Sequence, residues 1–261
     1  MLNANDYNIH NWSSIFSDRI DISCIPVSKS WKEYLCKFGE RSKYNKINQQ
    51  LTDDIKNGCD IFPYPALLYE AFNQIDFGDI KVVFIGQDPY FNSEIINNVK
   101  VPQATGLSFS VPVGVNIPPS LRNIFANQLK FGVIKSIPKH GNLISWSMQG
   151  CLMINSALTV RESESNSHKH YWTQITNNII KNISDELKDI MFVLWGNDAY
   201  LKREFIDLGK HYATISSHPS GLSCAKPMRT FGSFCETDHF NVINKHLIEI
   251  GENPIIWNGM Y

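Results

Sequence analysis

The 261-residue sequence lacks the features that mark several large classes of protein. It contains no apolar run of about 18 residues or more, so no membrane-spanning helix is expected. Its N-terminus, MLNANDYNIHNW, has neither the basic nor the apolar segment of a secretory signal. We therefore expect a protein that stays inside the cell and does not enter a membrane.

Paired cysteines and several cofactor motifs are also missing. The six cysteines, at positions 24, 36, 59, 151, 224 and 235, form no CxxC pair and no zinc or iron–sulfur spacing. A reduced protein without a metal is therefore favoured over a disulfide framework, with Cys151 as a small hydrophobic residue of an apolar run. The absence of GxxxxGK[ST] and GxGxxG disfavours a nucleotide hydrolase, and the absence of HxE with PCxxC disfavours a deaminase.

An excess of charge of one sign is absent as well. With 24 Lys and Arg against 25 Asp and Glu, the net charge is −1, so a nucleic-acid surface would have to be a local patch. A hydrophobic content of 43% and a charged content of 19% are typical of a globular protein with one substantial core. Residues 1–30 are irregular and are interpreted as an N-terminal arm of uncertain order, and residues 31–261 as a single domain.

Four short apolar runs predict buried strands, because each run is continuous and is bounded by turn residues. These runs are 80–86, 151–155, 190–196 and 212–217. Helical patterns separate and follow them, at 120–130, 170–188, 198–209 and 239–251. The alternation predicts an α/β domain whose central, mostly parallel four-stranded sheet has helices on both faces.

Some helix ends can be predicted from single residues. Ser120 is a plausible N-cap for 120–130, and Gly209 a plausible C-terminal residue for 198–209. The helix at 120–130 is expected to bury one apolar face, formed by Leu121, Ile124, Phe125 and Leu129.

Chemically distinctive residues follow three of the four predicted strands. Ligands of parallel sheets bind beyond the carboxyl ends of the strands, where GQDPY (86–90), Asn155 and SSHPSGLS (216–223) are expected to meet. The third strand ends in WGNDAY, a turn with less obvious chemistry. Asp88, Asn155 and His218 could each simply cap a helix or hold a turn. Together they supply an acid or base, an amide and an imidazole, and the amide suits the edge of a base.

Five motifs, in order along the chain, resemble those of the family 1 uracil-DNA glycosylases. GQDPY (86–90) resembles the water-activating loop of that family. The other matches are PQATGLSFSV (102–111) for the stacking phenylalanine, PPSL (118–121) for the proline-rich loop, MINSALTVR with NSH (153–161, 166–168) for the base-reading asparagine, and HPSGLS (218–223) for the DNA-intercalation loop. The resemblance extends from about Trp31 to Trp257.

The resemblance implies an enzyme of base excision repair that needs no cofactor. It would flip uracil out of DNA, hydrolyse the N-glycosidic bond and leave an abasic site, in the nucleus or cytoplasm, wherever the DNA resides. Ionised Asp88 would stabilise the cationic sugar and activate water, while His218 would bond to uracil O2. Phe109 would stack on the base, and Asn155 would read O4 and N3–H. Gln87 would help to hold the base, and Tyr90 would exclude the methyl group of thymine.

The same resemblance implies residues that contact DNA. Ser120, Ser220 and Ser223 would hold phosphates, and Leu222 would enter the base stack as a wedge. Lys226 and Arg229 supply positive charge nearby. Simpler interpretations are also open: caps or turn residues for the serines, a leucine folded onto the core, and solvated loop charges.

The sequence departs from the family pattern at three places. Phe91 follows Tyr90 where the family usually has histidine, and Gly221 stands where it usually has proline. Loops 91–105 and 224–238 are longer than usual and are candidate contacts for DNA or for a replication or repair protein. These departures leave a second hypothesis open: a glycosylase-fold protein that binds DNA or a replication partner, with weak or no excision activity.

Overall fold

A four-stranded sheet forms the centre of the computed structural model, which describes residues 1–38 and 41–258. Its strands are β2 (Val82–Gly86), β5 (Cys151–Asn155), β7 (Met191–Trp195) and β8 (Tyr212–Ser216). They lie in the order β5-β2-β7-β8, and every neighbouring pair is parallel. The predicted four-stranded sheet is confirmed, and it is wholly rather than mostly parallel.

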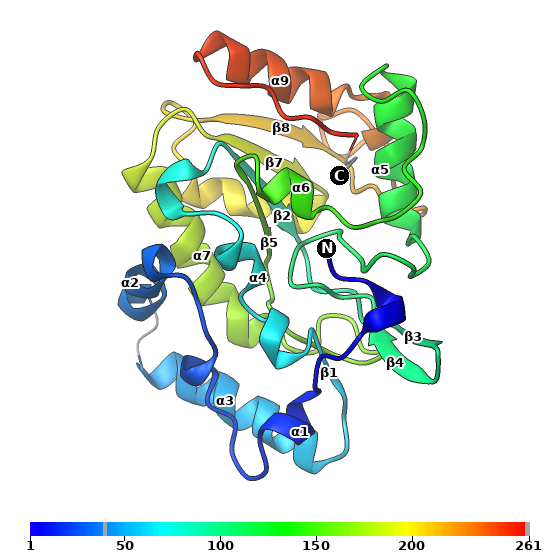
Figure 1. Ribbon diagram of the computed structural model, residues 1–261. Coiled ribbons are helices and arrows are strands. Elements are labelled where there is room, and N and C mark those ends of the chain that lie inside the picture. Colours follow the sequence, from blue (N-terminus) through cyan, green and yellow to red (C-terminus); the bar gives the residue numbers. More distant parts are fainter. Residues whose placement is uncertain (39–40, 259–261) are drawn as a thin grey trace.

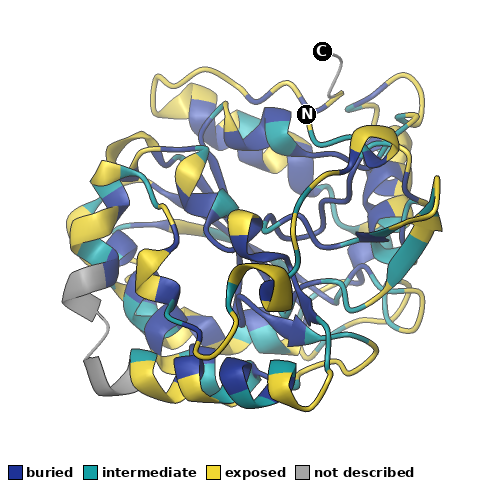
Figure 2. Ribbon diagram, turned by 60° about the horizontal axis from the view of Figure 1, so that its bottom comes forward, coloured by how far each residue is buried: buried dark blue, intermediate teal, exposed yellow. Residues whose placement is uncertain are grey.

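The strands are continuous apolar runs because layers of side chains cover both of their faces. Every residue of β2, β5 and β7 is buried, whereas the edge strand β8 is buried at only two of its five positions. Figure 2 shows the central strands in dark blue and the outward sides of the helices in yellow. Cys151 is fully buried as the predicted small hydrophobic residue.

Helices cover both faces of the sheet, as predicted (Figure 1). On one side lies α7 (Lys169–Glu186), which contacts α2 (Lys29–Phe38) and α3 (Arg41–Lys56). On the other side lie α5 (Pro119–Lys130), α6 (Ile144–Ser147) and α9 (His239–Glu249). The shorter helices are α1 (Trp12–Ile15), α4 (Glu70–Asn73) and α8 (Asn197–Leu201), with 3₁₀ turns at Ala4–Asp6, Ile22–Cys24, Pro65–Leu67, Phe77–Asp79, Lys202–Phe205 and Phe234–Glu236.

The predicted start of α5 is wrong. The helix begins at Pro119 with Pro118 at the N-cap, so Ser120 lies inside the first turn and does not cap it. Proline is well suited to the first helical position, because the N–H that it lacks would have no partner there. Leu129 was expected on the buried face, but it is 43% exposed.

The helix predicted over 198–209 also ends early. Its α-helical part stops at Leu201 and continues only as the 3₁₀ turn Lys202–Phe205, so Gly209 terminates no helix. The side chain of Asp207 accepts a hydrogen bond from the backbone N–H of Gly209 at 2.9 Å. Such local bonds compete with helical ones and favour a turn. The last helix, α9, ends two residues before the predicted boundary.

A β-hairpin that was not predicted lies within loop 91–105. Its strands are β3 (Ser93–Ile96) and β4 (Val99–Pro102), which pair antiparallel. The two turn residues, Asn97 and Asn98, have left-handed φ values of 51° and 61°, which asparagine tolerates better than most residues. The hairpin projects from the body of the molecule (Figure 1). A second small sheet pairs β1 (Ile61–Phe62) with β6 (Val160–Arg161).

The segment expected as an N-terminal arm, residues 1–30, lies along the surface of the domain. Trp12 is buried, and its indole N–H donates to the carbonyl of Pro63 at 2.9 Å. The backbone N–H of Ile20 donates to the hydroxyl of Thr52 in α3, also at 2.9 Å. These contacts attach the segment to both α3 and the chain that precedes β2.

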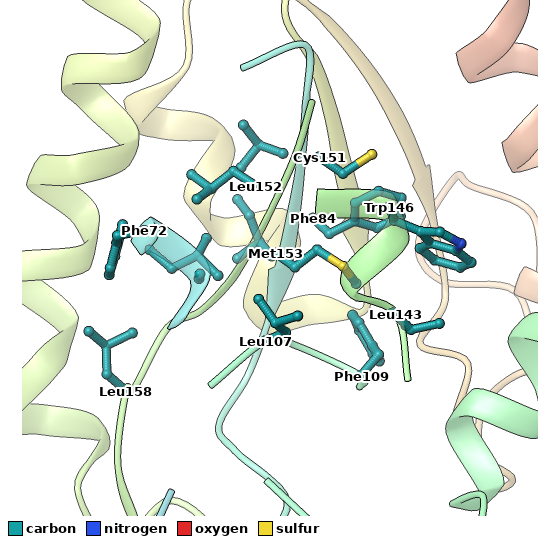
Figure 3. Close-up of a cluster of buried hydrophobic side chains, with 14 of the residues drawn as sticks. Phe72, Phe84, Leu107, Phe109, Leu143, Trp146, Cys151, Leu152, Met153 and Leu158 are labelled. Atoms are coloured by element: carbon teal, nitrogen blue, oxygen red, sulfur yellow. The ribbon is translucent and has the colours of Figure 1, made fainter. Parts of the chain in front are cut away.

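A cluster of large apolar side chains holds β2 in place. The ring of Phe84 in β2 lies 5.8 Å from that of Trp146 and 5.5 Å from that of Trp195. Figure 3 shows the part of this cluster around β2 and β5, with Phe109 at its lower end. The end of β2 is therefore firmly packed, and the turn with Asp88 starts from it.

Candidate active site

A cavity of about 190 Å³ lies at the carboxyl edge of the sheet. It is lined by residues 86–91, by Asn155 at the end of β5 and by His218 after β8. The chain runs from β2 to β5 on one side and then crosses to β7 on the other, so the cavity lies at the switch point where such sheets bind ligands. Pockets for drug-sized molecules are usually about 300–1,000 Å³, so this one suits a smaller group such as a single ring.

The carboxylate of Asp88 lines this cavity and is held through one oxygen. Oδ2 accepts hydrogen bonds from the backbone N–H of Asn166 at 2.7 Å and from the hydroxyl of Ser165 at 3.0 Å. No described residue bonds to Oδ1, which is left for a ligand or water. Burial raises the pKa of Asp88 above its ordinary value, although the two hydrogen bonds offset part of this effect. The carboxylate therefore takes up a proton more readily than that of an exposed aspartate.

The imidazole of His218 is neutral and has a defined tautomer. Burial lowers the pKa of His218 to about 4, so the ring is uncharged near pH 7. Its Nδ1 accepts a hydrogen bond from the backbone N–H of Ser220 at 3.0 Å. Because Nδ1 is an acceptor, the proton of the neutral ring lies on Nε2. The site therefore contains an uncharged donor opposite the acid.

Gly196, at the end of β7, supports His218, a role that the sequence analysis missed. Its φ of 87° is left-handed, and a Cβ there would lie 2.8 Å from the Cβ of His218. Only glycine allows this backbone and this approach without strain. The sign of this role in the sequence was Gly196 itself, because it directly follows a buried strand in WGND (195–198).

The carboxamide of Asn155 lies against the backbone of the neighbouring strand. Gly86 is its partner in the register between β2 and β5, and a Cβ at position 86 would lie 2.0 Å from Asn155 Oδ1. Asn155 is only 5% exposed, yet no described residue hydrogen-bonds to its carboxamide. A buried amide normally has partners, so this one is free to pair with a ligand that offers a donor beside an acceptor.

Gln87 and Tyr90 occupy the same turn as Asp88. The side-chain amide of Gln87 donates to Oδ1 of Asn166 at 2.7 Å, and the backbone carbonyl of Gln87 accepts from the backbone N–H of Ala157 at 3.0 Å. The hydroxyl of Tyr90 donates a long hydrogen bond, 3.4 Å, to the carbonyl of Phe109. Burial raises the pKa of Tyr90 above its ordinary value, so it remains a neutral phenol.

Phe109 has a backbone conformation that is uncommon for a bulky residue, with φ at 63°. Its ring packs edge-on to Trp195 with centroids 5.6 Å apart and lies 6.0 Å from the ring of His218. The same ring lines the cavity. The side chain of Phe109 therefore packs in the core and also lines the cavity.

The three predicted phosphate-binding serines lie at two places. Ser120 lines the cavity from the first turn of α5. The hydroxyls of Ser220 and Ser223 are 2.8 Å apart, and that of Ser223 donates to the carbonyl of His218 at 3.1 Å. Leu222 between them is 87% exposed and is not folded onto the core.

The two basic residues of the same region differ in their surroundings. Lys226 is exposed. The guanidinium of Arg229 donates to Oδ1 of Asn197 at 2.6 Å and lies 4.8 Å from the ring of Tyr200. Arg229 is thus fixed against α8, and Lys226 is not.

Ser165 and Asn166 are functional candidates that the sequence analysis did not assign. They lie in a polar stretch, RESESNSH (161–168), where no strand or helix was expected.

In the described part of the chain, no group of three or more metal-ligating side chains gathers, and no helix has the length and apolar character needed to cross a bilayer.

Comparison with known proteins agrees with this geometry. The family model of the uracil DNA glycosylase superfamily matches residues 72–254, more than half of the chain. The chain belongs to this superfamily. The family predicted from the five motifs is confirmed: its relatives within family 1 of the uracil-DNA glycosylases are similar over nearly the whole chain.

Three of these similarities show the extent of the match. A probable uracil-DNA glycosylase of Acanthamoeba polyphaga mimivirus is 36% identical over 270 residues, covering 99% of this chain and 72% of that protein. The uracil-DNA glycosylase of Bacillus subtilis is 38% identical over 232 residues, covering 88% and 96%. The crystal structure of mimivirus uracil-DNA glycosylase superimposes with a TM-score of 0.93 at 36% identity, covering 98% and 96% of the two chains.

Proposed function

We propose that this protein hydrolyses the N-glycosidic bond of uracil in DNA, releases free uracil and leaves an abasic site for base excision repair. The observation that carries this proposal is the convergence of Asp88, Asn155 and His218 on one small cavity, in a chain of the glycosylase family. Water is the nucleophile, so the reaction needs no cofactor.

Base recognition would depend on the free carboxamide of Asn155. Its N–H would donate to uracil O4 and its oxygen would accept from N3–H, whereas cytosine presents the reverse pattern. Phe109 would stack on the ring, a contact worth roughly 1–3 kcal/mol that offsets part of the cost of flipping. Gln87 would help to hold the base, and Tyr90 would clash with a methyl group on C5.

The chemical step would divide between the acid and the imidazole. As the bond to the base breaks, the sugar becomes cationic and the uracil anionic, as in other glycosyl transfers. Asp88 would stabilise the cation and orient or deprotonate the water that attacks it. The Nε2–H of neutral His218 would donate to uracil O2, which carries part of the developing negative charge.

DNA would be held around the cavity mouth. Ser120, Ser220 and Ser223 would bond to phosphates, and the exposed Leu222 would fill the gap in the base stack. Two basic residues would add positive charge on the same side, Lys226 from an exposed position and Arg229 from its fixed position against α8.

The wider setting follows from this activity. Uracil-containing DNA is the proposed partner, and the protein would act inside the cell, in the nucleus or cytoplasm. We assign the catalytic domain to residues 31–261, with 1–30 as its N-terminal arm. A replication or repair protein is a candidate partner for loops 91–105 and 224–238.

The test is uracil release from an oligonucleotide with a single uracil, followed by alkaline cleavage of the abasic product. The purified protein should cleave it, and Asp88→Asn should lose about 10²–10⁴-fold in rate, because a positioned acid or base contributes that much. An unchanged melting temperature would show that the variant is folded. An intact oligonucleotide after incubation with the wild-type protein would contradict the proposal and favour a binding protein with little or no activity.

A further inference from the structure

Asp88 is held by a turn that does not belong to the sheet, residues 161–168, called here the acid-holding turn. The turn donates to Asp88 Oδ2 from the hydroxyl of Ser165 and the N–H of Asn166. Through its side chain, Asn166 also accepts from Gln87 at 2.7 Å. One short segment therefore positions both the acid and an amide of the cavity.

The acid-holding turn has an unfavourable backbone. Ser163 and Asn166 both have left-handed φ values of 63°, which non-glycine residues rarely adopt. Such conformations persist only where the surrounding structure holds them. The contacts around the turn should therefore decide how well Asp88 is placed.

One set of contacts comes from the buried side of the turn. Asp54 in α3 accepts from Nε of Arg161 at 2.9 Å and lies 2.7 Å from Nε2 of His168. Asp54 and His168 are almost fully buried. The two ends of the turn are therefore fixed to α3, and its middle, which carries Ser165 and Asn166, is not.

The β3–β4 hairpin contacts the turn at Glu162, next to the end that is fixed to α3. The hydroxyl of Ser93 and the ammonium of Lys100 donate to the two carboxylate oxygens of Glu162, each at 2.7 Å. Lys100 also donates to Asp60 at 2.5 Å. Burial opposes ionisation of Glu162, but these two donors outweigh it and hold the pKa of Glu162 below its ordinary value. Lys100 thus joins the hairpin, the turn and Asp60, the residue before β1.

Phe91 joins the same assembly through its backbone. Its carbonyl accepts from the N–H of Ser163 at 2.8 Å, and the N–H of Glu162 donates to the carbonyl of Asp60 at 2.8 Å. Phe91, which replaces the usual histidine, lies two residues before the hairpin and contacts the turn. This contact does not depend on the side chain at position 91.

The hairpin is itself anchored on its other face. Glu94 accepts from the N–H of Asn116 at 3.1 Å and from its side chain at 2.8 Å. Val99, by contrast, is 40% exposed and pairs with Ile96, so it lies on the face of the hairpin opposite to Lys100. The hairpin thus has a bonded part that touches the acid-holding turn and an exposed part that does not.

We propose that the β3–β4 hairpin is a brace that positions Asp88, with Lys100 as its positioning residue, acting through Glu162 and the acid-holding turn. The proposal rests on the function proposed above, in which Asp88 must be ionised and well placed. The other charged groups that act on Asp88 are Lys169 of α7 and Asp198 of α8, and no hydrogen bond or ion pair joins either of them to the hairpin.

The first experiment compares Lys100→Met with Lys100→Arg on the single-uracil oligonucleotide. In Lys100→Met, kcat should fall about tenfold with KM nearly unchanged, since small displacements of catalytic groups cost up to about 10²-fold. The acid limb of the kcat/KM profile should move to higher pH, because weaker bonds from the turn let burial raise the pKa of Asp88 further. Lys100→Arg keeps the charge and should keep most of the activity.

A second pair of variants separates bracing from simple charge effects and from DNA contact. Glu162→Ala removes a negative charge, which by itself would lower the pKa of Asp88, whereas loss of the brace would raise it. Val99→Ser changes only the exposed part of the hairpin and should behave as wild type. If Val99→Ser loses as much activity as Lys100→Met, the hairpin contacts DNA and is not a brace.

The pKa of Asp88 can also be measured without any turnover, from the carboxyl carbon chemical shift in the wild type and in Lys100→Met. A pKa that is raised in Lys100→Met and also in Glu162→Ala, where the loss of charge alone would lower it, supports the brace even if no uracil is released, so failure of the proposed function would be recognised separately. A pKa that is lowered in Glu162→Ala would show a charge effect and overturn the brace. An unchanged pKa and pH profile in both Lys100→Met and Glu162→Ala, with melting temperatures like that of the wild type, would overturn the proposal.

Discussion

The two sides of the cavity are held by different kinds of structure. On the base-reading side, Asn155 ends a fully buried strand and lies so close to Gly86 that a Cβ at position 86 would come within 2.0 Å of its Oδ1. On the water-activating side, Asp88 depends on hydrogen bonds from the acid-holding turn, whose backbone is itself strained. Strand packing tolerates little displacement, whereas hydrogen bonds to a surface turn can loosen gradually. Substitutions on the base-reading side should therefore cause large losses of activity. Substitutions on the water-activating side should cause smaller, graded losses.

Gly86→Ala should have the largest effect, because it places a Cβ where Asn155 Oδ1 now lies. Displacing the base-reading amide should lower kcat/KM about 10²-fold. Overpacking should also destabilise the fold by about 1–3 kcal/mol. Excision kinetics and a thermal melt would measure the two effects. Wild-type kinetics in this variant would show that the strand side is as tolerant as the turn side.

His218→Gln should remove a pH-dependent contribution to stability. The folded-state pKa is depressed to about 4, so the neutral ring stabilises the fold above the unfolded value of about 6.5, and this contribution is lost as the pH falls from about 6.5 to 4. At pH 4.5 the loss in the wild type should be about 2 kcal/mol. Urea unfolding at pH 7 and pH 4.5 should give a smaller difference for the variant. Equal differences would show that burial does not keep His218 neutral.

Ser165→Ala tests the turn side directly. It removes one of the two donors to Asp88 Oδ2, so the pKa of Asp88 should rise and activity at neutral pH should fall about tenfold, with partial recovery as the pH increases. Ser165→Thr keeps the hydroxyl and serves as the matched control. A loss that is the same at every pH would indicate displacement of Asp88 without a change in its ionisation.

Phe91→His should have the smallest effect. Position 91 contacts the acid-holding turn through its backbone carbonyl, which the substitution retains, so excision should change by less than about tenfold. The measurement is kcat on the single-uracil oligonucleotide. A gain well beyond tenfold would show that the missing imidazole, and not the hairpin, limits the placement of water.

Much of the fold could be predicted because its signals are local. Continuous apolar runs indicated the four strands, since a strand covered on both faces needs no alternation. The hairpin within 91–105 was missed because Ile95 and Ile96 are adjacent and the turn is Asn-Asn without glycine. The cap at Ser120 was wrong because proline occupies the position before it and starts the helix.

In the candidate site, too, some residues could be predicted from local signals and others could not. Asp88, Asn155 and His218 could be predicted at one edge, because the carboxyl ends of parallel strands always meet there. Gly196 received no role, since its contact with His218 depends on how two neighbouring strand ends turn. Ser165 received none either, because nothing local marks a turn residue that bonds to an acid far away in the sequence.

By itself, the sequence determined the parallel sheet, the family and the identity of the residues at the strand ends, because hydrophobic pattern and motif order are properties of the chain alone. Only the tertiary structure decided which groups support them. The N–H that holds Asp88 comes from Asn166, 78 positions along the chain, and the proton of His218 lies on Nε2 because Ser220 occupies Nδ1. Such partners are set by packing and loop geometry, which bring together segments that share no local signal.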